Sequence, residues 1–211
     1  MKLIFDIGAN KGEKTDVFIT KAEKVICFEP NPDLAKLLKE KYANKNVIVN
    51  DVAVSDSIGE KVFSIANVDT ISTLEDDWIT NSRFSNREYT WDKKITVKTT
   101  TLDQIIEEYG IPDYVKIDVE GHEHRVLLPF TKLIPNTIFS FEWSEEHKSK
   151  IISILNHVHS LGYDKFAATI IDNLVFEEQL SPYWGSFDMM SRLESLDENR
   201  KELFVIIYFK K

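Results

Sequence analysis

The chain has 211 residues, of which 43% are hydrophobic and 29% charged, and its formal net charge at pH 7 is −9. This composition is typical of a globular protein and excludes disordered and fibrous classes, and the length suits one α/β domain with a substantial core. The negative charge argues against nucleic acid as a partner, because phosphate binding needs a concentrated basic face.

Cysteine content and hydropathy bear on the compartment. Cys27 is the only cysteine, so neither an intramolecular disulfide nor a cysteine-based zinc cluster can form. No apolar stretch approaches the roughly 20 residues of a membrane span, and the first predicted strand begins two residues into the sequence. We therefore expect a single domain over residues 1–211, without a membrane span and located in the cytoplasm.

The first predicted element is a short apolar strand over residues 3–7, which leads directly into a turn with two glycines. Gly8 can adopt a positive φ at little steric cost, and Gly12 leaves space where the following helix would otherwise crowd a ligand. A second apolar strand, over residues 25–29, ends on Glu29, about 20 residues after the turn. This is the spacing at which an α/β nucleotide site presents an acid to a ribose.

Further helices and strands are predicted along the rest of the chain. Helices are expected over residues 11–21, 33–42, 102–109, 120–128 and 144–161. Strands are expected over residues 47–54, 61–65, 94–100, 114–118, 137–142, 163–170 and 203–209. The first of these is broken by Asn50 and Asp51. The strand and helix alternation at the start of the chain predicts an α/β fold with a parallel sheet and helices on both faces.

Two long connections interrupt this pattern, at residues 67–93 and 172–202. An ordered domain rarely keeps so long a connection without a use for it, and we expect both to be insertions that cover the active site. If the strand before the second connection runs parallel to the rest of its sheet, this connection leaves the sheet at the edge where α/β folds bind ligands; simple loop packing and a homodimer contact are its alternatives. Four aromatic residues of the first insertion would either form a hydrophobic wall over a ligand or pack the insertion onto its own domain: Trp78, Phe84, Tyr89 and Trp91.

Five motifs stand in order along the chain: FDIGANKG (5–12), FEPNP (28–32), VAVSD (52–56), TLD (101–103) and KIDVEGHE (116–123). Together they resemble the FkbM-type methyltransferase family, over a region from Leu3 to Glu142. The resemblance implies methyl transfer from S-adenosylmethionine, generally to hydroxyl oxygens of sugars or polyketides. It also implies a Rossmann-like class I methyltransferase fold, whose doubly wound, mostly parallel seven-stranded sheet has an antiparallel last strand.

Seven residues are predicted to bind this cofactor. Glu29 is expected on the two ribose hydroxyls, because a carboxylate can accept both hydrogen bonds. The backbone around Asp51 and Ala53 would meet the adenine. The carboxylate of Asp6 would alternatively bond the amides of its own turn. The methionine half would be held by Asp6, Gly8, Asn10 and Gly12.

Transfer to an aliphatic hydroxyl needs a base, which contributes about 10²- to 10⁴-fold when it is positioned. Three candidates lie at or near predicted strand ends: Asp118, His122 and Glu142. A carboxylate at the end of a buried strand, as predicted for Asp118, is costly unless something binds it, and a histidine titrates near neutrality. Glu120, at the predicted helix start, would serve equally well as a helix cap or in catalysis.

A divalent cation held by Asp118, Glu142 and His122 is the competing device, because coordination also lowers the pKa of a hydroxyl. His122 and His124 are two residues apart on a predicted helix and would point to different faces, so they would not bind one metal together. The sequence therefore favours a reaction without a metal.

The predicted activity is that of an O-methyltransferase acting on a small hydroxylated molecule, with a sugar of a glycan or glycoconjugate as the expected acceptor. A dinucleotide-dependent oxidoreductase is disfavoured, because residues 8–12 lack the three-glycine pattern. A catalytically inactive binding protein on the same fold is the third alternative.

Overall fold

The computed structural model describes residues 1–85, 88–143, 148–169, 185 and 205–211. The strands of this part are β1 (Leu3–Ile7), β2 (Lys24–Phe28), β3 (Val47–Asn50), β4 (Ala53–Val54), β5 (Gly59–Ile65), β6 (Lys93–Thr100), β7 (Tyr114–Ile117), β8 (Ile138–Trp143), β9 (Lys165–Thr169) and β10 (Val205–Lys210). The helices are α1 (Glu13–Phe18), α2 (Pro32–Lys41), the 3₁₀-helix η1 (Asp69–Ile71), α3 (Asp76–Asn81), α4 (Leu102–Tyr109), α5 (Glu123–Leu127) and α6 (Lys148–Ser160).

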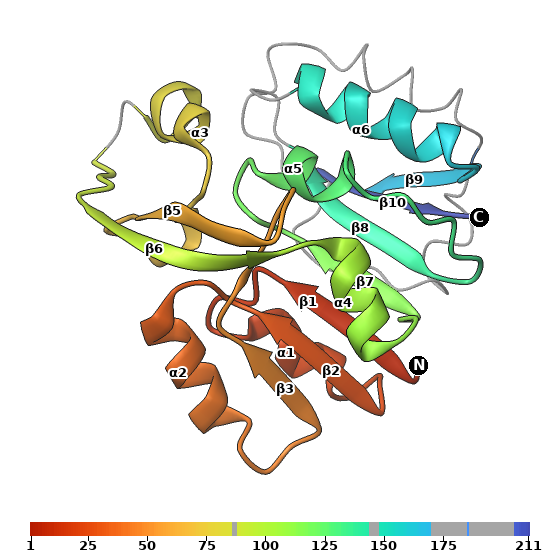
Figure 1. The fold of residues 1–211 in the computed structure, drawn as a ribbon, viewed down its shortest axis with the longest axis horizontal. Helices are drawn as coiled ribbons and strands as arrows, with labels where there is room; N and C mark the ends of the chain where they lie inside the picture. Colours follow the sequence, from red (N-terminus) through yellow and green to blue (C-terminus); the bar gives the residue numbers. More distant parts are fainter. Residues whose placement is uncertain (86–87, 144–147, 170–184, 186–204) are drawn as a thin grey trace.

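Seven strands form one sheet in the order β3-β2-β1-β7-β8-β10-β9 (Figure 1). Neighbouring strands are parallel except at β10, which runs antiparallel to both β8 and β9. The predicted fold, with its antiparallel last strand, is confirmed.

Helices cover both faces of this sheet. In β1, Phe5 and Ile7 pack with side chains of α4, α5 and α6, whereas Ile4 packs with side chains of α1 and α2. Successive side chains of a strand point to opposite faces, so a central strand covered on both sides is apolar throughout. Asp6 interrupts the apolar run of β1 and is nevertheless fully buried.

A second, three-stranded sheet has the order β4-β6-β5. The strand predicted over residues 47–54 is divided where Asn50 and Asp51 interrupt it, because the chain leaves the first sheet after Asn50 and pairs with β6 from Ala53 onwards. The prediction of one strand was therefore wrong, although the position of the break was right. Between β3 and β4, Asp51 turns to the surface and forms an ion pair with Lys39, 3.3 Å away. Ala53 is then buried in the small core of the second sheet.

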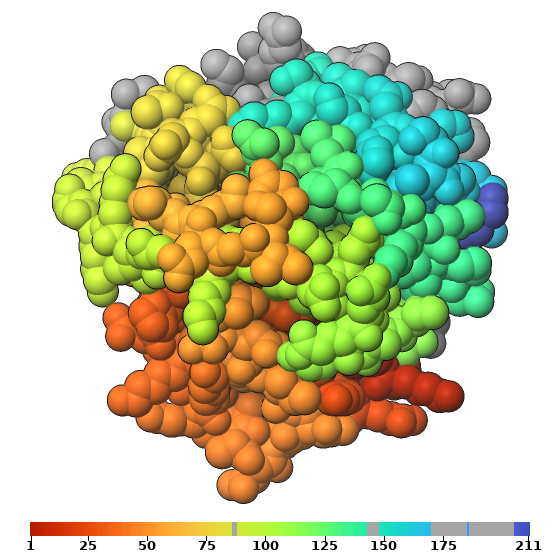
Figure 2. All heavy atoms as spheres, in the orientation of Figure 1, coloured from red at the N-terminus to blue at the C-terminus, as the bar shows by residue number. Residues whose placement is uncertain are grey.

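The insertion over residues 67–93 contains η1 and α3, and in the space-filling view it packs against β5 and lies beside α5 (Figure 2). Trp78 is buried, and its ring centroid lies 5.6 Å from that of Phe84. The indole nitrogen of Trp91 donates a hydrogen bond to the carbonyl oxygen of Ile71 at 2.9 Å. These two tryptophans therefore pack the insertion onto itself.

The predicted insertion over residues 172–202 lies outside the described residues except at Gly185, whose backbone pairs with Phe166. Among the helices that the structure describes, none combines the length and the apolarity of a membrane span.

Candidate active site

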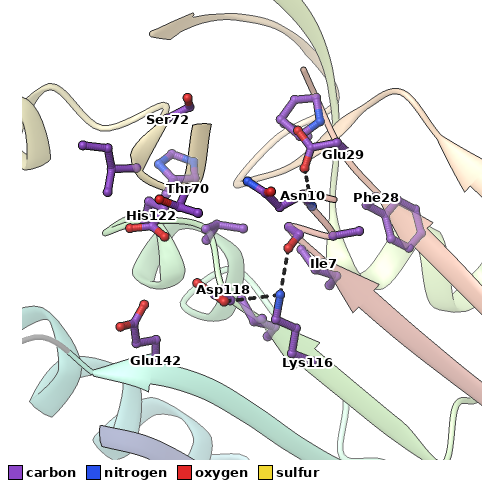
Figure 3. Close-up of a pocket in the computed structure, with 18 of the residues that line it drawn as sticks. Ile7, Asn10, Phe28, Glu29, Thr70, Ser72, Lys116, Asp118, His122 and Glu142 are labelled. Carbon is purple, nitrogen blue, oxygen red and sulfur yellow. Dashed lines mark hydrogen bonds and ion pairs between the residues drawn. The ribbon is translucent and has the colours of Figure 1, made fainter. Parts of the chain in front are cut away.

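A pocket of about 480 Å³ lies at the carboxyl ends of β1, β2, β7 and β8, with one wall formed by the first insertion (Figure 3). This is the edge at which open α/β sheets bind ligands. Four of the predicted cofactor residues line it, namely Gly8, Asn10, Glu29 and Ala53. The three predicted bases line it too: Asp118, His122 and Glu142.

Gly8 fixes how closely the loop after β1 approaches β7. It has a φ of +77°, and a Cβ atom there would lie 1.8 Å from the carbonyl oxygen of Asp118. Its N–H donates to the carbonyl oxygen of Phe28 at 2.9 Å, which ties the loop to the end of β2. Glycine is therefore required both for its conformation and for its missing side chain.

Gly12 has a different reason to be glycine. It does not line the pocket, and an added Cβ atom would lie 2.4 Å from the hydroxyl oxygen of Tyr42 and 2.8 Å from a methyl carbon of Leu38. The missing side chain makes room for Leu38 of α2 and for Tyr42, the residue that follows this helix, rather than for a ligand.

Glu29 follows directly after β2 and is 5% exposed. One carboxylate oxygen accepts a hydrogen bond from the N–H of Asn10 and the other accepts one from the N–H of Asn31, both at 2.8 Å. Each oxygen keeps a further lone pair with which to accept a ligand hydroxyl. Burial raises the pKa of Glu29 to about 7, against the opposing effect of these two N–H groups.

Asp6 lies beneath the loop and does not line the pocket. Thr15 donates a hydrogen bond to one of its oxygens at 2.6 Å, and the ammonium of Lys116 lies 3.3 Å from the other. Asp51 also lies outside the pocket lining, with its side chain in the surface ion pair described above.

Lys116 is a pocket residue that the sequence reasoning missed. Its ammonium donates to the carbonyl oxygen of Gly8 at 2.7 Å and lies 3.3 Å from the carboxylate of Asp118 (Figure 3). Burial alone would lower the pKa of Lys116, but the carboxylates of Asp118 and Asp6 raise it. The available signal was a lysine in the middle of a strand that otherwise reads as fully buried.

Asp118, Glu120 and Glu142 form the carboxylate cluster of the pocket, with one oxygen of each within 4.8 Å of the others. Burial and the neighbouring carboxylates raise the pKa values of Glu120 and Glu142 well above that of an ordinary glutamate. Carboxylate oxygens gathered in this way would suit a divalent cation, and they would equally accept hydrogen bonds from ligand hydroxyls or share a proton.

The predicted helix over residues 120–128 begins later than expected. Glu120 and Gly121 have φ values of 54° and 85°, which a right-handed helix does not allow, so α5 begins at Glu123. Glu123 accepts a hydrogen bond from the N–H of Val119 at 2.9 Å. The helix-cap prediction for Glu120 was therefore wrong, and Glu120 lines the pocket instead.

His122 is 3% exposed and has a partner at each ring nitrogen. Nε2 lies 2.9 Å from the hydroxyl oxygen of Ser55, and Nδ1 lies 3.2 Å from a carboxylate oxygen of Glu75. Burial lowers its pKa, although Glu75 opposes the shift. His122 thus joins the end of β4 to the insertion, and one of its ring nitrogens would have to leave its protein partner before it could bond to the hydroxyl of an acceptor.

The argument that His122 and His124 point to different faces was wrong. His122 precedes α5, and both side chains approach the same oxygen of Glu75, at 3.2 and 3.7 Å.

The insertion forms the opposite wall of the pocket. Phe84 and Tyr89 line it, with their ring centroids 5.4 Å apart and their planes at 82°. At the edge of the loop after β1, the ammonium of Lys11 lies 2.8 Å from the carboxylate of Asp69 in η1. Phe84 and Tyr89 thus line the pocket, and their role as a wall over a ligand stays a prediction. Trp78 and Trp91 pack within the insertion instead.

Comparisons with known proteins agree with this architecture. Residues 6–165 match the methyltransferase FkbM domain family. The chain is similar to the hexuronic acid methyltransferase AglP of Haloferax volcanii, at 30% identity over 141 residues, which cover 65% of this chain and 53% of that protein. It is also similar to ribosomal RNA small subunit methyltransferase A of Mycoplasma mobile, at 22% identity over 203 residues, which cover 95% of this chain and 78% of that protein.

A solved structure has a related fold. Methyltransferase FkbM from Methylobacillus flagellatus is similar with a TM-score of 0.52 and 17% identity, over 77% of this chain and 38% of that chain. The chain thus spans about half the length of AglP and less of this structure. A methyltransferase domain of this family implies S-adenosylmethionine as the methyl donor. Because the family match takes in most of the chain, the protein belongs to the methyltransferase FkbM domain family.

Proposed function

We propose that the protein transfers the methyl group of S-adenosylmethionine to a hydroxyl oxygen of a sugar in a glycan or glycoconjugate. The observation that carries this proposal is the composition of a single pocket. An acid suited to a ribose, Glu29, lies on one side of it, and the cluster of Asp118, Glu120 and Glu142 lies on the other.

The cofactor half fits a nucleoside with an amino-acid tail. The oxygens of Glu29 are fixed by two backbone N–H groups and retain lone pairs for the two ribose hydroxyls. The backbone of Gly8 and Asn10 would border the methionine part, and Ala53 the adenine. The cavity of about 480 Å³ lies in the range of small-molecule sites.

The acceptor half supplies a base. The bound cofactor provides a methyl group on a positively charged sulfur, which becomes a neutral thioether after transfer. As the acceptor oxygen bonds to the methyl carbon, its proton passes to a carboxylate, and Asp118 and Glu142 line the pocket for this role. Holding the acceptor in line supplies much of the remaining acceleration.

A sugar suits this pocket better than RNA does. Hydroxyl groups donate hydrogen bonds, which carboxylates accept, whereas the phosphates of RNA would be repelled by the cluster and by a net charge of −9. AglP is named as a methyltransferase of hexuronic acid, and this similarity supports a sugar as the acceptor.

Calorimetry and a methyl-transfer assay test the proposal in two stages. We expect the protein to bind S-adenosylhomocysteine and to bind neither NAD nor NADP. Labelled methyl groups should then pass to members of a panel of nucleotide sugars and oligosaccharides, and not to ribosomal RNA. Binding of a dinucleotide would support an oxidoreductase, binding of neither cofactor an inactive protein, and labelling of RNA alone a nucleic-acid methyltransferase.

The same assay decides the question of the metal. We predict equal rates with a chelator and with added Mg²⁺. Loss of activity on chelation, restored by Mg²⁺, would assign the carboxylate cluster to a cation instead of to a base.

A further inference from the structure

Lys116 has an unusual position for a lysine. Within the described part of the chain it is the only lysine or arginine that is buried, at 5% exposure. It lies on β7 directly beside Asp6 of β1, in the middle of the parallel sheet. A buried ammonium is costly unless it is paired and hydrogen-bonded.

The contacts of Lys116 go beyond what neutralisation requires. One carboxylate, that of Asp6, would suffice to balance its charge. The shortest contact is instead the 2.7 Å hydrogen bond to the carbonyl oxygen of Gly8, in the loop expected to carry the cofactor. The third partner is Asp118, a candidate base. The ammonium thus makes one hydrogen bond, to Gly8, and two ion pairs, with Asp6 and Asp118.

Gly8 and Asp118 also approach each other directly. The space that a Cβ atom of Gly8 would fill is taken by the carbonyl oxygen of Asp118. The ammonium of Lys116 therefore contacts both segments where they lie close together, as the dashed lines in Figure 3 show. A shift of either segment would cost it a hydrogen bond or an ion pair.

We infer that Lys116 is a positioning residue for methyl transfer, which holds the cofactor loop at Gly8 and the carboxylate of Asp118 in one fixed geometry. This inference rests on the proposed function, because it assigns the two segments to the cofactor and to the base. In this assignment Lys116 acts through Gly8 and Asp118, with its ammonium 2.7 Å from the carbonyl oxygen of the first and 3.3 Å from the carboxylate of the second.

The test compares Lys116→Met with the double variant Asp6→Asn/Lys116→Met. Methionine has a similar length and no charge, so the single variant leaves Asp6 buried without its cation and should unfold at a lower temperature. The double variant removes both charges and should recover most of the melting temperature. Its affinity for S-adenosylhomocysteine should nevertheless stay at least about tenfold below wild type, because the Gly8 carbonyl has lost its donor.

A comparison of affinity with turnover separates positioning from simple structural support. The double variant removes the ion pair with Asp118 as well as the hydrogen bond to Gly8, so its kcat at saturating S-adenosylmethionine should fall in addition to its affinity. Ile138→Ala is the matched control, since Ile138 is buried on the same side of the sheet and does not line the pocket. It should lower the melting temperature without changing either the affinity or kcat.

Recovery of wild-type affinity and of wild-type kcat by the double variant would show that Lys116 only neutralises Asp6, and would overturn the inference. Wild-type affinity in Lys116→Met would overturn it as well. Failure of the wild-type protein to bind S-adenosylhomocysteine would instead overturn the proposed function. If Lys116→Met does not fold, the charge-balanced double variant still decides the question.

Discussion

The two halves of the pocket hold their acids in different ways. In the cofactor half, each carboxylate oxygen of Glu29 accepts a hydrogen bond from a backbone N–H group. The N–H of Gly8 donates a hydrogen bond to the carbonyl oxygen of Phe28, which holds the loop after β1 against the end of β2. In the acceptor half, three carboxylates face one another within 4.8 Å, and Lys116 contacts only Asp118 among them. The first half is thus held by backbone hydrogen bonds, whereas in the second burial and neighbouring carboxylates raise the pKa values of Glu120 and Glu142.

This difference suits the cofactor half to binding and the acceptor half to proton transfer. Fixed hydrogen bonds favour tight and specific binding, because little order has to be gained when the ligand arrives. The carboxylate cluster of the acceptor half offers several oxygens that can accept or share a proton, as transfer from a hydroxyl requires. Four predictions follow from the contrast between a binding half and a reacting half.

The largest effect is expected in the acceptor half. Asp118→Asn should lower kcat by about 10²- to 10⁴-fold, the range for a lost base, and should leave the affinity for S-adenosylhomocysteine close to wild type. Steady-state kinetics with calorimetry measures both, and Asp164→Asn, an exposed substitution on the loop before β9, is the control. An unchanged kcat contradicts the assignment, and a larger loss in Glu142→Gln moves the base to Glu142.

The next effect belongs to the cofactor half. Glu29→Ala should weaken binding of S-adenosylhomocysteine at least tenfold, because hydrogen bonds to a charged group contribute about 1.5–3 kcal/mol each and about 1.4 kcal/mol is a factor of ten. The matched control is Glu40→Ala, which removes an exposed acid from the following helix. Equal affinities in the two variants would remove Glu29 from the ribose site.

The pH dependence of cofactor binding tests the role of Glu29 further. Glu29 must be ionised to accept two ribose hydroxyls, and burial raises its pKa to about 7. Below that pKa a proton has to leave before the ligand binds, so affinity should fall by up to about tenfold for each pH unit below 7 and level off above it. Calorimetry at pH 6, 7 and 8 measures the slope. Glu29→Gln should lack it, and a slope that persists in this variant belongs to another group.

The smallest effect is expected where the two walls meet at the surface. Lys11 and Asp69 join the loop after β1 to η1, and their side chains are 54% and 29% exposed. Such pairs are screened by solvent, so Lys11→Ala should change the KM for S-adenosylmethionine by no more than about fivefold. Asp69→Ala and the double variant complete the cycle. A change of a hundredfold would mean that this pair holds the insertion closed over the cofactor.

Local sequence accounts for much of the first half of the pocket. The apolar runs of β1 and β2, the glycine turn and the acid at the end of β2 are close together in the chain, and their pattern predicted the sheet edge and the lining residues Gly8, Asn10 and Glu29. Asp6 and Gly12 of the same turn were predicted there too and do not line the pocket.

The division between β3 and β4 was only partly visible. Asn50 and Asp51 interrupt the apolar run of residues 47–54, but only pairing with β6 decides that the second part joins another sheet.

The sequence also did not predict which side chains contact one another across the sheet. Asp6 and Lys116 are 110 positions apart in the sequence and adjacent on neighbouring strands. His122 meets Ser55 and Glu75 only because the second sheet and the insertion lie against the start of α5. Glu120 enters the pocket because Glu120 and Gly121 adopt left-handed conformations that delay the helix.

The sequence by itself determined the α/β class, the positions of the main strands along the chain and the acids near their carboxyl ends. Hydrophobic periodicity and turn residues, which carry this information, act over a few neighbouring positions. The tertiary structure alone decided which acids share a pocket and which acid of the cluster the buried Lys116 contacts. It also decided that both ring nitrogens of His122 have protein partners. Those relations depend on distances between segments far apart in the chain, and burial then sets their charge.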